Sequence, residues 1–425
     1  GELGRPEEAL AAIEEAVRIR QALAAQRPEV YQPDLALSLN NLANRLAALG
    51  RPEEALAAIE EAVRIRQALA AQRPEVYQPD LALSLNNLAN RLAELGRPEE
   101  ALTAIEEANR LYRALAAQRP DTYQPDLASS LNNLANQLAG IGRPEEALTA
   151  IEEAVRIRQA LAAQRPEVYQ PDLALNLNNL AIQLGELGRP EDALAAIEEA
   201  VRIRQALAAQ RPEVYQPDLA LSLNNLAVLL AALGRPEEAL AAIEEAVRIR
   251  QALAAQRPEV YQPDLALSLN NLANRLAELG RPEEALTANE EATGLYRALA
   301  AQRPDTYQPD FAGSLNNLAN RLAGIGRPED SLTAIEEAVR IRQALAAQRP
   351  EVYQPDLALS LNNLAVQLGE LGRPEDALAA IEEAVRIRQA LAAQRPEVYQ
   401  AALSRSRRVA AWLSGEGTEE SGDTW

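Results

Sequence analysis

Leucines recur along the chain at the spacing of one helix face. Within residues 33–49 they are separated by four, three, four and three positions, at Leu35, Leu39, Leu42, Leu46 and Leu49. This spacing is typical of an amphipathic α-helix. Asp34 is a candidate N-cap at its start, and Gly50 stands where a helix can end in the left-handed conformation. We therefore expect a first helix over residues 33–49.

A second apolar pattern follows Gly50. Pro52 suits the first position of a helix, and Glu53 and Glu54 suit the positive end of its dipole. Its apolar face is formed by Ile59, Ala62, Val63 and Leu69. The next segment, residues 73–79, contains two prolines, and we expect it to be a loop. Each unit is therefore predicted to consist of a helix, a tight turn, a longer helix and a loop.

This unit is repeated along nearly the whole chain. Gly50 and Gly96 are 46 positions apart, and the segment that Gly50 opens returns at Gly96, Gly142, Gly188, Gly234, Gly280, Gly326 and Gly372. Such a unit cannot bury its apolar face alone, so neighbouring units must stack. We predict an all-α solenoid of antiparallel helix pairs that forms one elongated domain and offers an extended binding surface.

The repeat divides the chain into four parts. We expect a partial first repeat over residues 1–32, eight complete repeats over 33–399, a capping helix over 400–413 and a flexible acidic tail over 414–425. Residues 1–3 match the end of a first helix, so the chain is expected to be a fragment. Its uncapped N-terminal end is a candidate surface for end-to-end self-association.

Composition excludes several kinds of chemistry. The net charge is −20, which disfavours a nucleic-acid partner, and the chain has no cysteine and no histidine for thiol chemistry or zinc binding. No apolar run approaches the roughly 20 residues that span a membrane. We expect a cytoplasmic protein with no cofactor, no metal site and no membrane association.

No catalytic motif stands out. The glutamate pairs Glu53/Glu54 and Glu60/Glu61 recur in nearly every unit, and adjacent residues of a helix point in directions about 100° apart. Nothing matches a phosphate-binding loop or a nucleophile elbow. We therefore predict that this chain is not an enzyme.

The first helix has three faces. Its leucines point into the helix pair, and Ala36, Ala43 and Ala47 form a narrow side that another helix can approach. The remaining face carries Leu37, Asn41, Asn44, Arg45 and Ala48. This remaining face is the one expected to be open to a ligand.

The pattern resembles the tetratricopeptide repeat. Its large, small and glycine positions are occupied by Leu39, Leu42, Ala43, Leu46, Gly50, Ala55, Ile59 and Ala62. The string Leu39-Asn40-Asn41-Leu42-Ala43, present in all eight complete copies, and the extended second helix make it similar to the kinesin-light-chain subtype. The resemblance covers residues 1–399, although the unit is longer than in that subtype.

The resemblance implies a right-handed superhelix whose concave wall is built from the first helices and holds a protein or peptide segment. Asparagines at the positions of Asn41 and Asn44 then contact the ligand, and arginines replace the lysines that some members use for carboxylates. The implied site residues are Asn41, Asn44, Arg45, Asn87, Asn90, Arg91, Asn133, Asn136, Asn179, Asn225, Asn271, Asn274, Asn317, Asn320 and Asn363.

Two asparagine positions have different expected roles. Asn40 lies beside the small-residue side, and we expect it to form hydrogen bonds between stacked helices. For Asn41, contact with a ligand and a purely internal role are equally expected. The tyrosine of each unit, such as Tyr77, is expected to fill the gap between adjacent units.

Differences between the copies are informative because the other copies act as internal controls. Ile182, Val228 and Leu229 stand where most copies have asparagine or arginine, and we interpret them as a hydrophobic floor in the middle of the groove or, equally, as drift between copies. Asn289 replaces a core isoleucine, and Gly294 lies in the same helix. We expect the array to open first there.

These patterns favour a non-enzymatic scaffold that binds an extended peptide or partner segment. Two alternatives stay open. Bacterial relatives with such arrays are often the sensor arm of a signalling ATPase or of a caspase-like protease, and uncapped arrays can also stack end to end into a structural fibre.

Overall fold

The computed structural model describes residues 6–415, and this part of the chain forms eighteen consecutive α-helices. The odd-numbered helices correspond to the second helix of each predicted unit. They are α1 (Pro6–Gln26), α3 (Pro52–Gln72), α5 (Pro98–Gln118), α7 (Pro144–Gln164), α9 (Pro190–Gln210), α11 (Pro236–Gln256), α13 (Pro282–Gln302), α15 (Pro328–Gln348) and α17 (Pro374–Gln394).

The even-numbered helices correspond to the predicted first helices. They are α2 (Pro28–Ala48), α4 (Pro74–Glu94), α6 (Pro120–Gly140), α8 (Pro166–Glu186), α10 (Pro212–Ala232), α12 (Pro258–Glu278), α14 (Pro304–Gly324), α16 (Pro350–Glu370) and α18 (Pro396–Ser414). The prediction of an all-α solenoid of helix pairs is confirmed.

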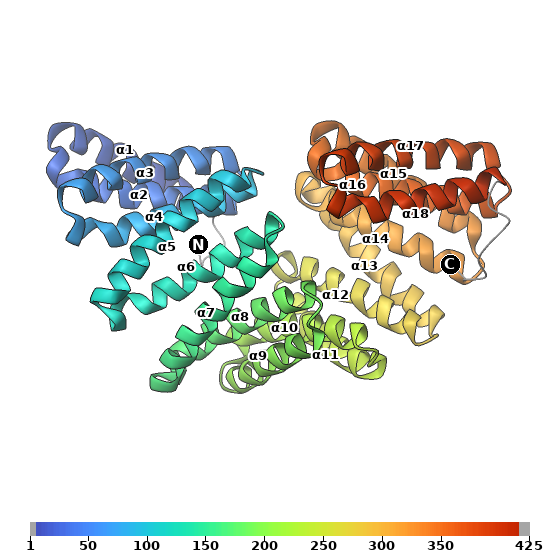
Figure 1. The fold of residues 1–425 in the computed structure, drawn as a ribbon, viewed down its shortest axis with the longest axis horizontal. Helices are drawn as coiled ribbons and strands as arrows, with labels where there is room; N and C mark the ends of the chain where they lie inside the picture. Colours follow the sequence, from blue (N-terminus) through green and yellow to red (C-terminus); the bar gives the residue numbers. More distant parts are fainter. Residues whose placement is uncertain (1–5, 416–425) are drawn as a thin grey trace. The chain divides into compact units, whose positions relative to one another are not determined.

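The chain divides into two compact units, Gly1–Tyr215 and Gln216–Trp425, with the boundary inside α10. In the first unit each helix from α1 to α9 packs against its neighbour in the chain, and the even-numbered helices α2, α4, α6 and α8 also contact one another in order. In the second unit each helix from α11 to α18 likewise packs against its neighbour in the chain, and α14, α16 and α18 contact one another in order. Figure 1 shows the helices of each unit lying side by side in chain order.

The prediction of a loop over residues 73–79 is wrong. Arg73 alone separates α3 from α4, with φ −140° and ψ 76°, an extended conformation that suits a residue before proline. Its amide donates a hydrogen bond of 2.9 Å to the Leu69 carbonyl at the end of α3. Its carbonyl accepts hydrogen bonds from the amides of Val76 and Tyr77, so α4 begins at the next residue. The two helices of a pair consequently have the same length, 21 residues.

Pro79 lies inside α4 without ending it. Proline has no N–H to donate to the carbonyl four residues earlier. Here that carbonyl belongs to Glu75, an exposed residue in the first turn of α4. The same arrangement recurs at Pro33 in α2. Asp34 therefore lies within α2 and is not its N-cap, and Arg27 holds that position without a side-chain hydrogen bond.

Each predicted glycine turn is confirmed. Gly50 has φ +72°, and its amide and that of Arg51 donate to the carbonyls of Ala47 and Leu46 at 3.0 Å. Arg51 also donates two hydrogen bonds of 2.6 Å to the Glu54 carboxylate, which joins the turn to the start of α3. The turn therefore folds each pair back on itself within three residues.

The core lies between the helices of successive pairs. Ile59 is fully buried in α3, and Leu39 and Leu85 pack in the same cluster from the even-numbered helices. Tyr31 and Tyr77 pack against this cluster, which agrees with the role expected for the tyrosine of each unit. Residues 400–413, the expected capping helix, lie within α18, which begins earlier, at Pro396. Residues 416–425 of the expected tail lie outside the described part of the chain.

Candidate functional site

The proposed site residues all lie on even-numbered helices, from α2 to α16, and each is exposed or partly exposed. In each helix they share one side, because the positions of Leu37, Asn41 and Asn44 follow the helical spacing of four and three. Within each unit, we call the surface formed by these positions and those of Arg45 and Ala48 the even-helix face.

The residues of the Asn40 position join neighbouring even-numbered helices. In the first unit, the buried Asn40 Oδ1 of α2 accepts a hydrogen bond from Asn87 Nδ2 of α4 at 3.1 Å and one from Ser84 Oγ at 3.3 Å. In the second unit, Asn224 accepts the same pair of hydrogen bonds from Asn271 and Ser268. The internal role expected for Asn40 is confirmed.

The Asn41 position therefore has an internal contact as well. The Nδ2 donor of Asn179 reaches Asn132 Oδ1 at 2.8 Å, and that of Asn363 reaches Asn316 Oδ1 at 3.2 Å. Each bond uses only the donor half of a partly exposed amide. An amide side chain also offers an Oδ1 acceptor, so the same residue is able to join the helices and accept a hydrogen bond from a ligand.

A buried arginine of the odd-numbered helix also takes part in this network. Arg66 of α3 donates to the Asp80 carbonyl at 2.7 Å and to Ser84 Oγ, the same hydroxyl that donates to Asn40. Burial lowers the pKa of Arg66, and the nearby Asp80 partly offsets the effect. The network thus joins α3 to the following helix, α4, and to the preceding helix, α2.

The arginines at the Arg45 position are mostly engaged within the protein. Arg91 pairs with Glu94 at 3.0 Å, and Arg275 pairs with Glu278 at 2.9 Å, three residues along the same helix. Arg321 donates to Asn274 Oδ1 at 2.9 Å, and desolvation lowers its pKa. A ligand carboxylate would have to compete with a resident glutamate at two of these arginines.

Leu37 lies on the face that was expected to be open, but its position was not among the predicted binding positions. Leu83 is 42% exposed, although a leucine of this size is usually buried in a helix pair. The same position is exposed in most other even-numbered helices, at Leu37, Leu175, Leu221, Leu267 and Leu359. Ser129 and Gly313 occupy it in α6 and α14. The sequence contained a signal for this position, because Leu37 falls outside the spacing of the core leucines.

The proposed hydrophobic floor is divided between the two units. Ile182 of α8 is exposed in the first unit, whereas Val228 and Leu229 of α10 belong to the second, where Val228 is exposed and Leu229 is partly exposed. Asn41, Asn44 and Arg45 are brought together with Ile13 of α1 around an open depression of about 460 Å³.

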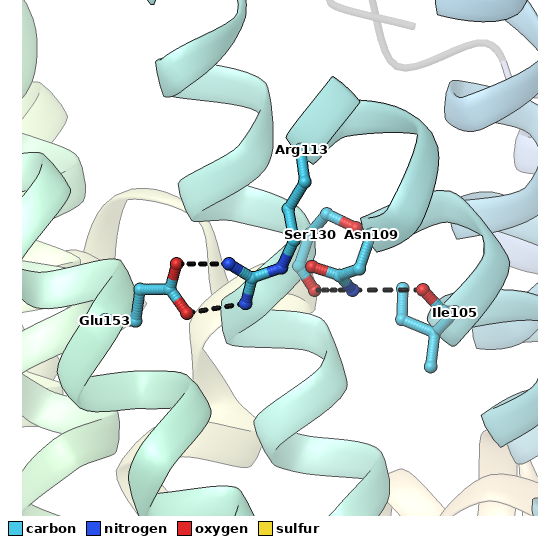
Figure 2. Close-up of polar contacts among 5 residues, drawn as sticks. All are labelled: Ile105, Asn109, Arg113, Ser130 and Glu153. Atoms are coloured by element: carbon cyan, nitrogen blue, oxygen red, sulfur yellow. Dashed lines mark hydrogen bonds and ion pairs between the residues drawn. The ribbon is translucent and has the colours of Figure 1, made fainter. Parts of the chain in front are cut away.

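Two repeats lack the buried arginine. Tyr112 in α5 and Tyr296 in α13 occupy its position, and both are buried. In α5, Asn109 Nδ2 donates to the carbonyls of Ile105 and Ser130, whereas Asn109 Oδ1 and Ser130 Oγ have no partner among the described residues (Figure 2).

A charged contact on the exposed side joins α5 to α7. Arg113 of α5 donates two hydrogen bonds of 2.6 Å to the carboxylate of Glu153 in α7, and this pairing raises the pKa of Arg113 (Figure 2). Both residues come from odd-numbered helices. The contact therefore stabilises the side of the array away from the even-helix face.

Within residues 6–415, no group of three or more acidic residues is placed to hold a metal ion, and no helix is both long and apolar enough to cross a membrane.

Sequence models described as tetratricopeptide repeat match the chain in both units, and together their matches cover more than half of it. A short match to anaphase-promoting complex subunit 5 is confined to residues 1–27. No curated protein matches the sequence significantly. The repeat matches span residues 35–71, 81–117, 126–206, 172–252, 265–300, 311–347 and 357–392.

Solved structures with the same fold are only distantly similar in sequence. The STAND protein with a tetratricopeptide repeat sensor, PH0952 from Pyrococcus horikoshii, is 17% identical with a TM-score of 0.51, over 83% of this chain and 50% of that chain. The apo form of RapI is 14% identical with a TM-score of 0.51, over 73% and 98% of the two chains.

A third structure matches a smaller share of the chain. A putative kinesin light chain from Podosopora anserina with nearly identical TPR-like repeats is 24% identical with a TM-score of 0.41, over 53% of this chain and 98% of that chain.

Proposed function

The chain belongs to the tetratricopeptide repeat family, and we propose from this premise that it is a non-enzymatic scaffold that binds a protein or peptide segment along its even-helix face. Tetratricopeptide repeats generally mediate interactions between proteins. The observation that carries the proposal is the recurrence, on the exposed sides of α4, α8, α12 and α16, of an apolar leucine beside an asparagine whose donor is held by the neighbouring even-numbered helix.

The exposed leucines supply the apolar part of this surface. Leu37 and Leu83, at 45% and 42% exposure, stand at the same position of neighbouring helices α2 and α4. Burying an exposed leucine side chain against a partner contributes about 1.5–3 kcal/mol. Repeated leucines therefore favour a partner with several apolar side chains along its length.

The asparagines supply the polar part. Asn87 lies one helical turn from Leu83, and its Nδ2 is already held by Asn40. Its Oδ1 is therefore held in place to accept a hydrogen bond, such as one from the N–H of an extended backbone. Because every backbone carries that group, the asparagines bind with little sequence preference and the leucines supply selectivity.

The array itself suggests a test with little risk to the fold. Serine naturally occupies the leucine position in α6, as Ser129, so we would change Leu83, Leu175, Leu221, Leu267 and Leu359 to serine in one variant. The matched control changes four exposed alanines of odd-numbered helices to threonine. Threonine occupies the same position in α5, as Thr103. These alanines are Ala57, Ala195, Ala241 and Ala379.

Both variants and the unchanged chain would be used as bait in extracts, with bound proteins identified by mass spectrometry. The proposal predicts partners that bind the unchanged chain and the threonine variant but are lost from the serine variant. Identical partners on all three baits would show that the even-helix face does not bind, and the proposal would fail.

A further inference from the structure

The last two even-numbered helices, α16 and α18, form a small pocket. Its lining residues are Val366 and Glu370 of α16 and Val409 and Trp412 of α18, and its volume is about 170 Å³. A cavity of about 150 Å³ is large enough to hold benzene. The pocket therefore has room for one side chain of a partner.

This pocket belongs to the even-helix face. Val366 and Trp412 stand at the position of Asn44, and Val409 stands at the position of Asn41. Helix α18 packs against α16 and α17, and Ser406 Oγ donates to Asn362 Oδ1 at 2.9 Å, as Ser84 does to Asn40. Helix α18 thus keeps the place of an even-numbered helix, but apolar side chains replace the amides.

The Trp412 ring is held by a close approach to the backbone. A Cβ at Gly369 would lie 3.0 Å from Trp412 Cη2 and 2.6 Å from Leu413 Cδ2, so only glycine fits there without movement. Trp412 nevertheless stays 44% exposed. The pocket therefore presents part of an aromatic ring to solvent.

Glu370 differs from Glu94 and Glu278, which stand at the same position of α4 and α12. Glu94 and Glu278 each pair with an arginine three residues earlier, Arg91 and Arg275. In α16 that position is Gln367, which is buried and accepts a hydrogen bond from Ser331 Oγ at 3.0 Å. No arginine of residues 6–415 lies within ion-pair distance of the exposed Glu370, so its charge is available to a partner.

We propose that this pocket holds a lysine or arginine side chain of a protein partner. Such side chains bury their methylene groups along apolar surfaces and keep the charged group in water. Here the methylenes would lie on Trp412, Val366 and Val409 and the cation beside Glu370, where the indole ring adds a favourable cation–π contact. The inference rests on the proposed function, because it places one residue of the partner on the even-helix face.

The test uses the fluorescence of Trp412. The chain has two tryptophans, so Trp425→Phe in the full chain leaves Trp412 as the single reporter. The probes are the peptide acetyl-Ala-Ala-Lys-Ala-Ala-amide, its arginine counterpart, and a counterpart with norleucine, which has no cationic group. We expect a saturable change with lysine or arginine and about fivefold weaker binding with norleucine, since an exposed ion pair and a cation–π contact contribute modestly.

Two substitutions separate the pocket from general charge effects. Glu370→Gln is expected to remove the preference for lysine over norleucine. The matched control Glu278→Gln, at the same position of α12, is expected to leave the preference unchanged, because Glu278 is already paired with Arg275.

Three results with the peptides would overturn the inference. They are a norleucine peptide that binds as well as the lysine peptide, a lysine preference that survives Glu370→Gln, and the lack of any saturable response. A Trp412 signal that depends on protein concentration without peptide would instead show a second copy as the occupant, and would also overturn it. None of these results bears on the leucine test, so the proposed function would stand or fall separately.

Discussion

Single substitutions between the copies show what each side chain does. In one repeat, Arg66 donates a hydrogen bond to Ser84 Oγ. In the next repeat Tyr112 stands at the position of Arg66, and the equivalent hydroxyl, Ser130 Oγ, has no partner among the described residues. In the second unit the same exchange, at Tyr296, is accompanied by two new polar groups. There Asn289 Nδ2 donates to Asn270 Oδ1 at 2.6 Å, and Thr293 Oγ1 lies 2.8 Å from Ser314 Oγ.

Asn109→Val is expected to stabilise the first unit. The substitution restores the residue of most copies and removes Asn109 Oδ1, a buried acceptor without a partner among the described side chains. Such a group costs about 1–3 kcal/mol, so we expect a gain of about 1 kcal/mol. The measurement is the local opening free energy of α5 from hydrogen exchange.

Thr293→Val is the matched control in the second unit. Thr293 Oγ1 donates to the Asn289 carbonyl at 2.8 Å, so its removal is expected to destabilise α13 by about 1 kcal/mol. A stabilising effect of both valines would show that hydrophobicity alone matters at this position, against our interpretation.

A pH effect is expected at Asp310. Desolvation raises the pKa of this carboxyl, which lies in α14 close to Tyr296. A carboxyl whose folded-state pKa is raised favours folding when protonated. Its contribution is present below the unfolded-state pKa and is lost as the pH rises through the folded-state pKa.

Asp310→Asn should therefore become more stable than the unchanged chain as the pH rises through that range, with little difference in acid. Thermal unfolding across the acidic range measures the difference. In a chain that keeps Asp310, Tyr296→Arg is expected to lower the pKa of this carboxyl by adding a nearby positive charge, which NMR titration would follow. An unchanged carboxyl titration would contradict the assigned cause.

At the scale of the helices, most boundaries were predictable from short-range chemistry. The spacing of Leu35, Leu39 and Leu42 predicted α2, and Gly50 predicted the turn, because both signals depend on local geometry. The segment 73–79 was not predictable by the same rules. Pro74 starts a helix and Pro79 is tolerated inside it because the affected carbonyl is exposed, a tertiary feature that two prolines in a sequence do not reveal.

The candidate site was predictable in part for a similar reason. The position of Asn40 beside small residues predicted its contact between helices, which the structure confirms. The use of the Asn87 donor in that contact depends on the distance between α2 and α4, and the exposure of Leu83 depends on how the pair packs. Neither quantity is contained in the spacing within one helix.

Helix α13 is expected to open before α15 of the same unit. Asn289 is fully buried and its Oδ1 has no partner among the described residues, although its Nδ2 is satisfied. Gly294 occupies an exposed position where α15 has Arg340, and an interior glycine costs about 1 kcal/mol. Hydrogen exchange of the full chain should show faster exchange in α13, and Gly294→Arg should slow it. Equal protection of α13 and α15 would refute the prediction.

At the scale of the whole molecule, repetition allows one surface to be built many times. The same leucine and asparagine positions recur in α2, α4 and α8 of the first unit and in α12 and α16 of the second. Repeat arrays bind through such extended surfaces, because each pair contacts only its neighbours and leaves its outer faces free. A long partner is therefore able to contact several repeats, and loss of one leucine should matter less than loss of all.

The most direct test of the central claim is site-specific photo-cross-linking to a partner recovered by the bait experiment. A photoreactive benzoylphenylalanine would replace Leu175 on the even-helix face in one variant and the exposed Ala195 of an odd-numbered helix in another. Our account predicts a cross-linked complex from position 175 and none from position 195. Cross-linking from position 195 alone would place the partner on the odd-numbered helices and contradict the account.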